Sequence, residues 1–84
     1  MVDVGLLVER KIRVRCSEQA PKAVNLGGRW LRVTGVLDVW KDVGCWWQGE
    51  REKVFYRIEI AGGGVLEVYR ALGVDGWTLY RVYD

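Results

Sequence analysis

Three strand-like segments follow one another at the C-terminal end of the sequence: residues 53–60 (KVFYRIEI), 65–72 (VLEVYRAL) and 77–83 (WTLYRVY). Apolar and polar residues alternate in each of them, and a period of two is typical of a strand with one buried face. Glycine-rich turns separate the segments, at residues 62–64 and 73–76, and glycine is favoured in the tight turns of hairpins. Residues 53–83 therefore predict three consecutive antiparallel strands.

The same alternation occupies residues 2–16 at the N-terminus. Even positions there are mostly apolar, whereas odd positions carry charges such as Lys11 and Arg13. Arg10 interrupts the apolar face near its middle. We therefore expect a strand that bends at residues 9–11, in preference to two short strands joined there.

A further strand is predicted over residues 30–40, where Gly35 indicates a bulge or a bend. The preceding segment, residues 17–29, contains the only proline, Pro21, and the pair Gly27-Gly28. Such a composition is typical of a loop. We therefore predict a long irregular connection over residues 17–29.

These segments predict an all-β fold. Four or five strands with short turns, and no amphipathic helix of ten residues, are typical of an antiparallel domain. The 84 residues fit a single domain, residues 1–84. A sheet of four or five strands buries one face only if it curls on itself or is covered. We therefore predict a small SH3-like or OB-like barrel of about five strands. An open sheet that dimerises through its face is the alternative.

The composition argues against most enzyme chemistry. Because the sequence has no histidine, a serine or cysteine nucleophile would lack its usual general base. Two cysteines without histidine cannot complete a four-ligand structural zinc site. The glycines at 62–64 lack the Lys-Ser/Thr pair and the helix of a phosphate-binding loop. We expect a protein that is not an enzyme and holds neither a metal nor a cofactor.

The chain lacks the usual signals for membranes and export. No apolar run approaches the roughly 18 residues of a membrane span, and the N-terminus does not have the pattern of a signal peptide. We therefore expect a cytoplasmic protein. A bridge between Cys16 and Cys45 would be unusual in a reducing cytosol, but the sequence leaves their pairing open.

Acidic residues alternate with cations in the C-terminal half of the chain. In so small a domain there is little room for a cleft with a catalytic acid and base. We interpret these carboxylates as solvated partners of nearby arginines and lysines; they are Glu50, Glu52, Glu59, Glu67 and Asp75.

The dipeptide Tyr-Arg occurs once on each of the last three predicted strands, as Tyr56-Arg57, Tyr69-Arg70 and Tyr80-Arg81. Aromatic rings interleaved with cations are typical of surfaces that stack bases and contact phosphates. Strict alternation puts Arg57 and Arg70 on opposite phases, so the pairs form one stripe only if a strand contains a bulge. The structural interpretation is that tyrosines cap the barrel and that arginines pair with Glu59 and Glu67.

Two adjacent tryptophans, Trp46 and Trp47, lie in a predicted loop. Neighbouring side chains of an extended chain point in opposite directions, so one ring would be exposed. Exposed tryptophan is enriched at binding hot spots, whereas a domain this small also needs aromatic rings to close its core. The sequence leaves both interpretations open.

Several stretches resemble a known family: residues 30–40, Gly44-Cys45-Trp46-Trp47, and residues 55–58, 64–70 and 77–84. They are similar to a small bacterial domain of unknown function that also occurs as the C-terminal segment of ImuB-type mutagenesis proteins, Y-family-polymerase-like partners in translesion synthesis. The resemblance covers roughly residues 29–84. It implies contact with other repair proteins and assigns no catalytic residue.

The sequence therefore predicts a non-enzymatic macromolecular interaction module, a protein-binding tether linked to DNA repair through this resemblance. The candidate surface comprises Trp46, Trp47, Tyr56, Arg57, Tyr69, Arg70, Tyr80 and Arg81. A protein partner is preferred because the net charge is only +2, whereas nucleic-acid binding depends on neutralising phosphates. Single-stranded DNA or RNA is the alternative partner. We expect no membrane contact, and the sequence leaves open whether the chain forms a homodimer.

Overall fold

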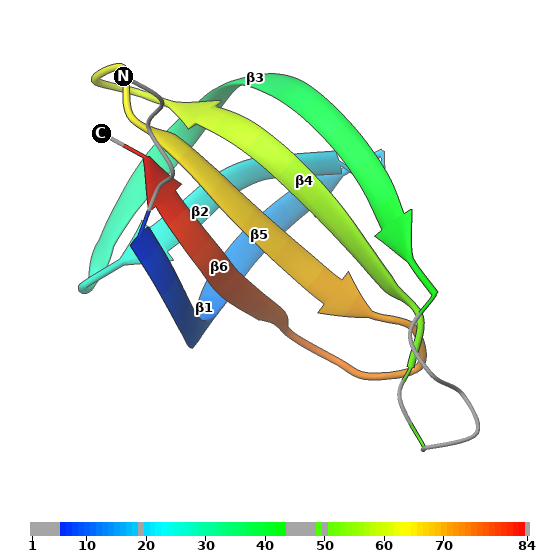
Figure 1. The fold of residues 1–84 in the computed structure, drawn as a ribbon. Helices are drawn as coiled ribbons and strands as arrows, with labels where there is room; N and C mark the ends of the chain where they lie inside the picture. Colours follow the sequence, from blue (N-terminus) through cyan, green and yellow to red (C-terminus); the bar gives the residue numbers. More distant parts are fainter. Residues whose placement is uncertain (1–5, 19, 44–48, 50, 84) are drawn as a thin grey trace.

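The computed structural model describes residues 6–18, 20–43, 49 and 51–83. Its strands are β1 (Leu6–Ser17), β2 (Ala20–Leu26), β3 (Arg29–Asp42), β4 (Lys53–Ile60), β5 (Val65–Ala71) and β6 (Trp77–Tyr83). Each strand pairs antiparallel with the next and β6 pairs with β1, so the sheet closes into a barrel in meander order (Figure 1). The predicted small all-β barrel is confirmed, with six strands in place of about five, and the closure excludes the open sheet.

The two longest strands each change partner part-way along. β1 pairs with β6 as far as Ile12 and with β2 from Arg13 onward. β3 pairs with β2 as far as Arg32 and with β4 from Val33 onward. We call the five-stranded part sheet A (second half of β3, β4, β5, β6, first half of β1) and the three-stranded part sheet B (second half of β1, β2, first half of β3). Sheet B crosses behind sheet A in Figure 1.

Both long strands are bent by irregular residues. Glu9 has a φ of 48°, in the left-handed region, and the register with β6 shifts between Leu7 and Arg10. The predicted bend at residues 9–11 is therefore confirmed. In β3 the register shifts between Val33 and Gly35, which confirms the predicted irregularity at Gly35.

The predicted irregular connection over residues 17–29 is wrong, because β2 lies within it. Pro21 is compatible with this strand because the pairing of β2 with β3 starts only at Ala23, and proline is tolerated where one side of a strand is unpaired. Gly27 and Gly28 form the two-residue turn into β3 with φ values of 59° and 84°. Two successive positive φ values are typical of the tight hairpin turn that favours glycine.

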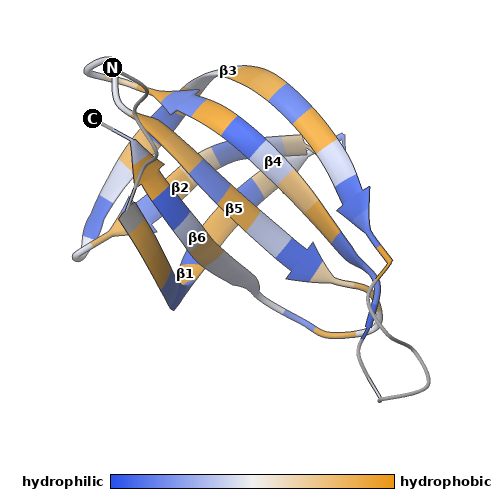
Figure 2. Cartoon of the chain, in the orientation of Figure 1, coloured by the Kyte–Doolittle hydropathy of each residue, from blue (hydrophilic) through white to orange (hydrophobic). Residues whose placement is uncertain are grey.

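The inner faces of the two sheets enclose the core. The alternation of hydrophobic and hydrophilic residues along the strands, visible in Figure 2, directs one set of side chains inward. The buried cluster consists of Val24, Tyr56, Ile58, Ile60, Leu66, Val68, Trp77 and Leu79. Most of these residues belong to β4, β5 and β6, so sheet A supplies most of the core. No helix among the described residues is long and apolar enough to cross a membrane.

Candidate interaction face

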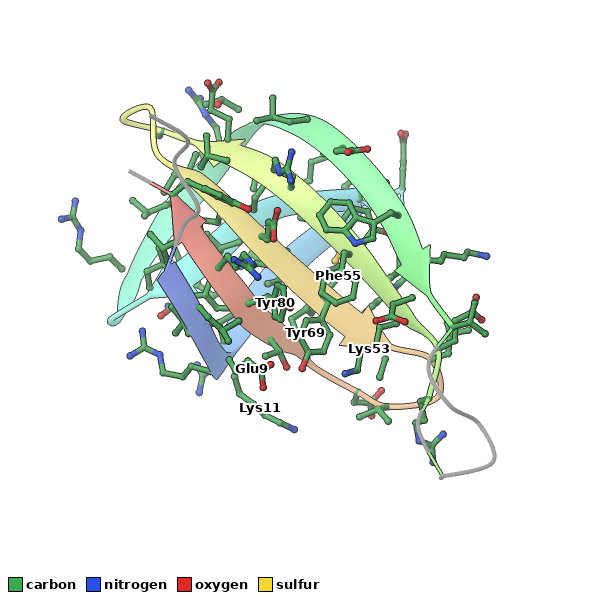
Figure 3. The ribbon with its side chains drawn as sticks, viewed as in Figure 1. Glu9, Lys11, Lys53, Phe55, Tyr69 and Tyr80 are labelled. Carbon is green, nitrogen blue, oxygen red and sulfur yellow. The ribbon has the colours of Figure 1, made fainter. Side chains whose placement is uncertain are left out.

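The outside of sheet A carries a cluster of aromatic rings, Trp40, Phe55, Tyr69 and Tyr80, which we call the aromatic face. Figure 3 shows three of them, Phe55, Tyr69 and Tyr80. Strand pairing sets Trp40 opposite Phe55 and Phe55 opposite Tyr69. Phe55 stacks on Trp40 with the ring centroids 5.4 Å apart, and its centroid lies 4.9 Å from Tyr69 and 5.0 Å from Tyr80. These rings leave Phe55 only 5% exposed, although it lies outside the barrel.

Charged side chains border the aromatic face. The Lys53 Nζ lies 5.0 Å from the centroid of the Tyr69 ring. On the other side, Lys11 of β1 pairs with Thr78, which pairs with Tyr69. Figure 3 shows Lys53 beside Tyr69, with Glu9 and Lys11 approaching the rings from β1. The face is therefore apolar at its centre and charged at its margin.

A row of alternating charge lies next to the aromatic face. Strand pairing sets Arg57 opposite Glu67 and Glu67 opposite Arg81. The Nε and Nη2 of Arg57 donate to Glu67 Oε2 at 3.0 and 2.8 Å, and the Tyr83 hydroxyl donates to the same oxygen at 2.9 Å. The Arg81 Nε lies 3.8 Å from Glu67 Oε1. The expected pairing of an arginine with Glu67 is confirmed, but the expectation of a solvated carboxylate is wrong, since Glu67 is 2% exposed.

The hydrogen bonds to Glu67 contribute to raised pKa values of both donors. Its hydrogen bond raises the pKa of the Arg57 guanidinium above the ordinary value. Burial, followed by the hydrogen bond to Glu67, raises the pKa of the Tyr83 hydroxyl above its ordinary value of 10.0. Both groups are protonated donors at neutral pH, and the raised pKa values extend this state to higher pH.

A bulge in β6 brings one Tyr-Arg pair onto the outside. Glu67 pairs with Arg81 whereas the next residue, Val68, pairs with Leu79, so Tyr80 is an extra residue in β6. Tyr80 and Arg81 consequently both lie on the outer side of sheet A. The bulge does not unite the three Tyr-Arg pairs, because β4 and β5 pair without a register shift and Arg57 and Arg70 stay on opposite sides of the sheet.

The other two Tyr-Arg pairs are divided between the two sides of sheet A. Tyr69 and Arg57 lie outside, as described above. Tyr56 belongs to the core and its ring centroid lies 5.4 Å from that of Trp77. The Arg70 guanidinium lies 5.5 Å from the centroid of the Trp77 ring, and its Nε is buried and has no hydrogen-bond partner among the described residues. The candidate surface therefore loses Tyr56 and Arg70 and retains the remaining members of the three pairs.

Gly44, Cys45, Trp46, Trp47 and Glu50, all named above, lie outside the described residues. Cys16 is an exposed free thiol. Within the described ranges, no group of three or more Cys, Asp and Glu side chains is arranged to hold a metal ion. The described outer surface of sheet A combines aromatic rings with paired charges.

Comparison with known proteins identifies the family. A family model described as "Domain of unknown function (DUF6504)" matches residues 2–84. The chain belongs to this family. No curated protein and no solved structure matches this DUF6504 chain.

The DUF6504 chain also carries a cation-rich region that its overall composition conceals. Residues 6–32 contain seven Lys and Arg against two Glu, whereas residues 33–84 contain six Lys and Arg against eight Asp and Glu. The net charge of +2 is therefore an average over two unlike parts. Counting charge by segment would have revealed this asymmetry before the fold was known.

Proposed function

We propose that this chain is a non-enzymatic interaction module that binds a partner protein along sheet A. The partner would add an extended segment to the edge of sheet A and would contact the aromatic face beside it. Strand addition of this kind obtains its affinity from main-chain hydrogen bonds and its specificity from alternate side chains.

The observation that carries this proposal is a free edge on β3, which remains in the closed barrel because the pairing of β3 with β2 ends at Arg32. Residues 33–42 pair with β4 on one side, and no strand in the described part of the chain pairs with their other side. Val36, Leu37 and Val39 lie on this edge and are 42%, 54% and 50% exposed. An apolar strand edge in that state is a template for pairing with another chain.

The aromatic face supports a protein partner at this edge. Trp40 lies in β3 itself, so an added strand would lie next to the stacked pair of Trp40 and Phe55. Aromatic residues are enriched in protein interfaces, and unpaired charges are depleted from their centres. Because Arg57 already donates to Glu67, the neighbouring row offers little positive charge to a phosphate. These features favour protein over nucleic acid on sheet A.

The resemblance to the C-terminal segment of ImuB-type mutagenesis proteins gives the proposal its biological setting. In such a setting the module would tether a repair protein in translesion synthesis. The proposed role in repair is supported by the resemblance, whereas the proposed binding site at the β3 edge is supported by the geometry of the barrel.

A capture experiment with the immobilised chain tests this function. We expect wild-type protein to retain a defined set of proteins from a native cell extract, both at about 0.15 M salt and at higher salt, because apolar contacts are not screened. A Leu37→Lys/Val39→Lys variant should lose them, since lysine on a strand edge blocks pairing. Quantitative mass spectrometry compares the retained proteins.

The matched control is Leu7→Lys/Val74→Lys, which places the same charges at positions that are 53% and 42% exposed outside the β3 edge. This control should retain the wild-type set. Retention of the same set by the edge variant would contradict the proposal. If sedimentation shows a wild-type dimer that the edge variant abolishes, the partner at this edge is a second copy of the chain.

A further inference from the structure

Within the described part of the chain, no carboxylate forms an ion pair with a cation of residues 6–32. The ion pairs of the described residues involve Lys41, Arg57 and Arg81, all of which lie later in the chain. The unpaired group consists of Arg10, Lys11, Arg13, Arg15, Lys22, Arg29 and Arg32. Concentrated positive charge without internal partners attracts a polyanion, even on a protein whose net charge is small.

Three of these cations form a line along β1. Val14 packs against the core, so its neighbours Arg13 and Arg15 point outward, and Lys11 lies on the same side of the strand. Alternate residues of a strand are separated by roughly 6.6 Å. This separation is comparable to that of successive phosphates along an extended polynucleotide.

A second row on β3 faces this line across the narrow β2. Asn25 of β2 pairs with Arg13 of β1 on one side and with Trp30 of β3 on the other. Ala23 of β2 likewise pairs with Arg15 of β1 and with Arg32 of β3. The outside of sheet B therefore carries cations on both flanking strands and small side chains between them. We call Arg13, Arg15, Trp30 and Arg32 of sheet B, together with Lys11 at the adjoining end of sheet A, the basic face.

The basic face also contains an aromatic platform. Trp30 is 40% exposed, and the Arg15 guanidinium carbon lies 4.4 Å from the centroid of its ring. Unpaired bases stack on aromatic rings and on guanidinium planes alike. The pair of Trp30 and Arg15 thus joins a stacking surface to a positive charge, as single-strand-binding proteins do.

A groove continues the basic face where β1 separates from β2. It is lined by Arg10, Lys11, Arg13, Asn25, Gly27 and Gly28. The Gly28 N–H donates to the Asn25 Oδ1 at 3.1 Å, which fixes the turn beside the cations. The groove therefore extends the positive surface from sheet B toward the edge of sheet A.

We propose that the basic face and this groove bind a single-stranded polynucleotide, with its phosphates along β1 and a base stacked at Trp30 and Arg15. This site is separate from the β3 edge, so the module would join a protein partner to a nucleic acid. A single strand fits better than a duplex because Trp30 and Arg15 offer stacking surfaces that bases inside a duplex cannot reach.

Fluorescence anisotropy with labelled twelve-nucleotide thymidine and uridine strands tests the site. If four phosphates are neutralised, the affinity should fall about 50-fold between about 0.05 and 0.2 M salt. Trp30→Ala should weaken binding roughly 5- to 150-fold with little change in this salt dependence. Arg13→Ala/Arg15→Ala should weaken binding and reduce the slope of log affinity against log salt by about 1.4.

The matched control is Lys41→Ala/Arg51→Ala, which removes two exposed cations from other strands and loops and lowers the net charge from +2 by the same amount. Its affinity should stay within about twofold of wild type, because screening confines the effect of distant charges.

Arg13→Gln/Arg32→Gln leaves Arg15 on Trp30 and keeps the test valid if the first variant unfolds. The edge variant Leu37→Lys/Val39→Lys should bind the strand like wild type, which separates this site from the proposed protein contact.

Saturable binding of either single strand with these variant effects supports the proposal, and the tighter of the two identifies DNA or RNA as the preferred ligand. Four results would overturn it: no binding to either strand, equal losses in the control pair, duplex binding as tight as single-strand binding, or equal affinity for a twelve-residue polyglutamate peptide. The last result would assign the face to acidic proteins.

Discussion

The outer surfaces of sheets A and B use arginine in opposite ways. On sheet A, Arg57 donates twice to Glu67, a carboxylate that is 2% exposed. On sheet B, Arg15 lies over an exposed tryptophan and has no carboxylate partner among the described residues. Sheet A therefore uses its outer charges to stabilise itself, whereas sheet B leaves its charges available to a ligand.

The outer rings differ in the same way. Phe55 contacts three other rings and is nearly buried, while Trp30 keeps 40% of its surface exposed. A barrel of this size gains stability from a second apolar cluster outside its core, because a short chain buries little surface internally. In a chain of this length, the burial of an aromatic residue must therefore be known before the residue can be assigned to stability or to binding.

The largest effect should come from removing the central ring of the aromatic face. Phe55→Ala should lower the free energy of unfolding by about 3 kcal/mol, since it removes a nearly buried ring and leaves a cavity. Trp30→Ala should cost less, about 1 kcal/mol, because the ring is partly exposed and loses mainly its contact with Arg15. Urea unfolding measures both, and equal losses would erase the distinction between the two faces.

Removal of the buried charge should have the next largest effect. Glu67→Gln should lower the free energy of unfolding by about 2 kcal/mol, because it weakens charge-assisted hydrogen bonds from Arg57 and Tyr83. The control is Glu59→Gln on β4, whose carboxylate accepts one hydrogen bond from Thr34 on the exposed surface. Its loss should be below about 1 kcal/mol. A Glu67 variant as stable as this control would show that sheet A does not depend on its outer charges.

Alternation predicted the strands wherever one face is buried. The apolar phase of β4, carried by Tyr56, Ile58 and Ile60, is the phase that enters the core, so period two was sufficient. It was insufficient for β2, because Pro21 and two glycines have the composition of a loop. There the partner strands, not the local residues, decide that the segment is extended.

The candidate site was harder to predict because it depends on register. The bulge at Tyr80 and the burial of Glu67 both arise from pairing between strands, which the amino-acid composition does not reveal. The basic face was readable in principle, since residues 6–32 hold seven of the 13 cations. The overall charge concealed it, because the acidic residues concentrate in the rest of the chain.

A smaller effect, with a characteristic pH dependence, should follow from Tyr83→Phe. Loss of the 2.9 Å hydrogen bond to Glu67 should cost about 1 kcal/mol at neutral pH. Burial and this hydrogen bond raise the pKa of Tyr83 in the folded protein, so the stabilisation is complete below the ordinary tyrosine value and disappears as the pH rises through the raised value. Urea unfolding from pH 7 to 11 should show the two proteins converging above about pH 10. A difference that persists unchanged to pH 11 would contradict this role for Tyr83.

The smallest effect on stability is expected at the β3 edge, where the side chains contribute little to the packing of the barrel. Leu37 is 54% exposed and the register between Val36 and Asp38 shifts around it, so its side chain contributes little to the core. Leu37→Lys should therefore change the free energy of unfolding by less than about 0.5 kcal/mol, the usual range for surface substitutions. If Leu37 can be replaced at so small a cost, the stability of the barrel does not require an apolar residue at this position. A contact with another chain would explain why the exposed residue is apolar. A loss near that of Phe55→Ala would instead make the edge part of the folded core and remove the main support for a protein partner there.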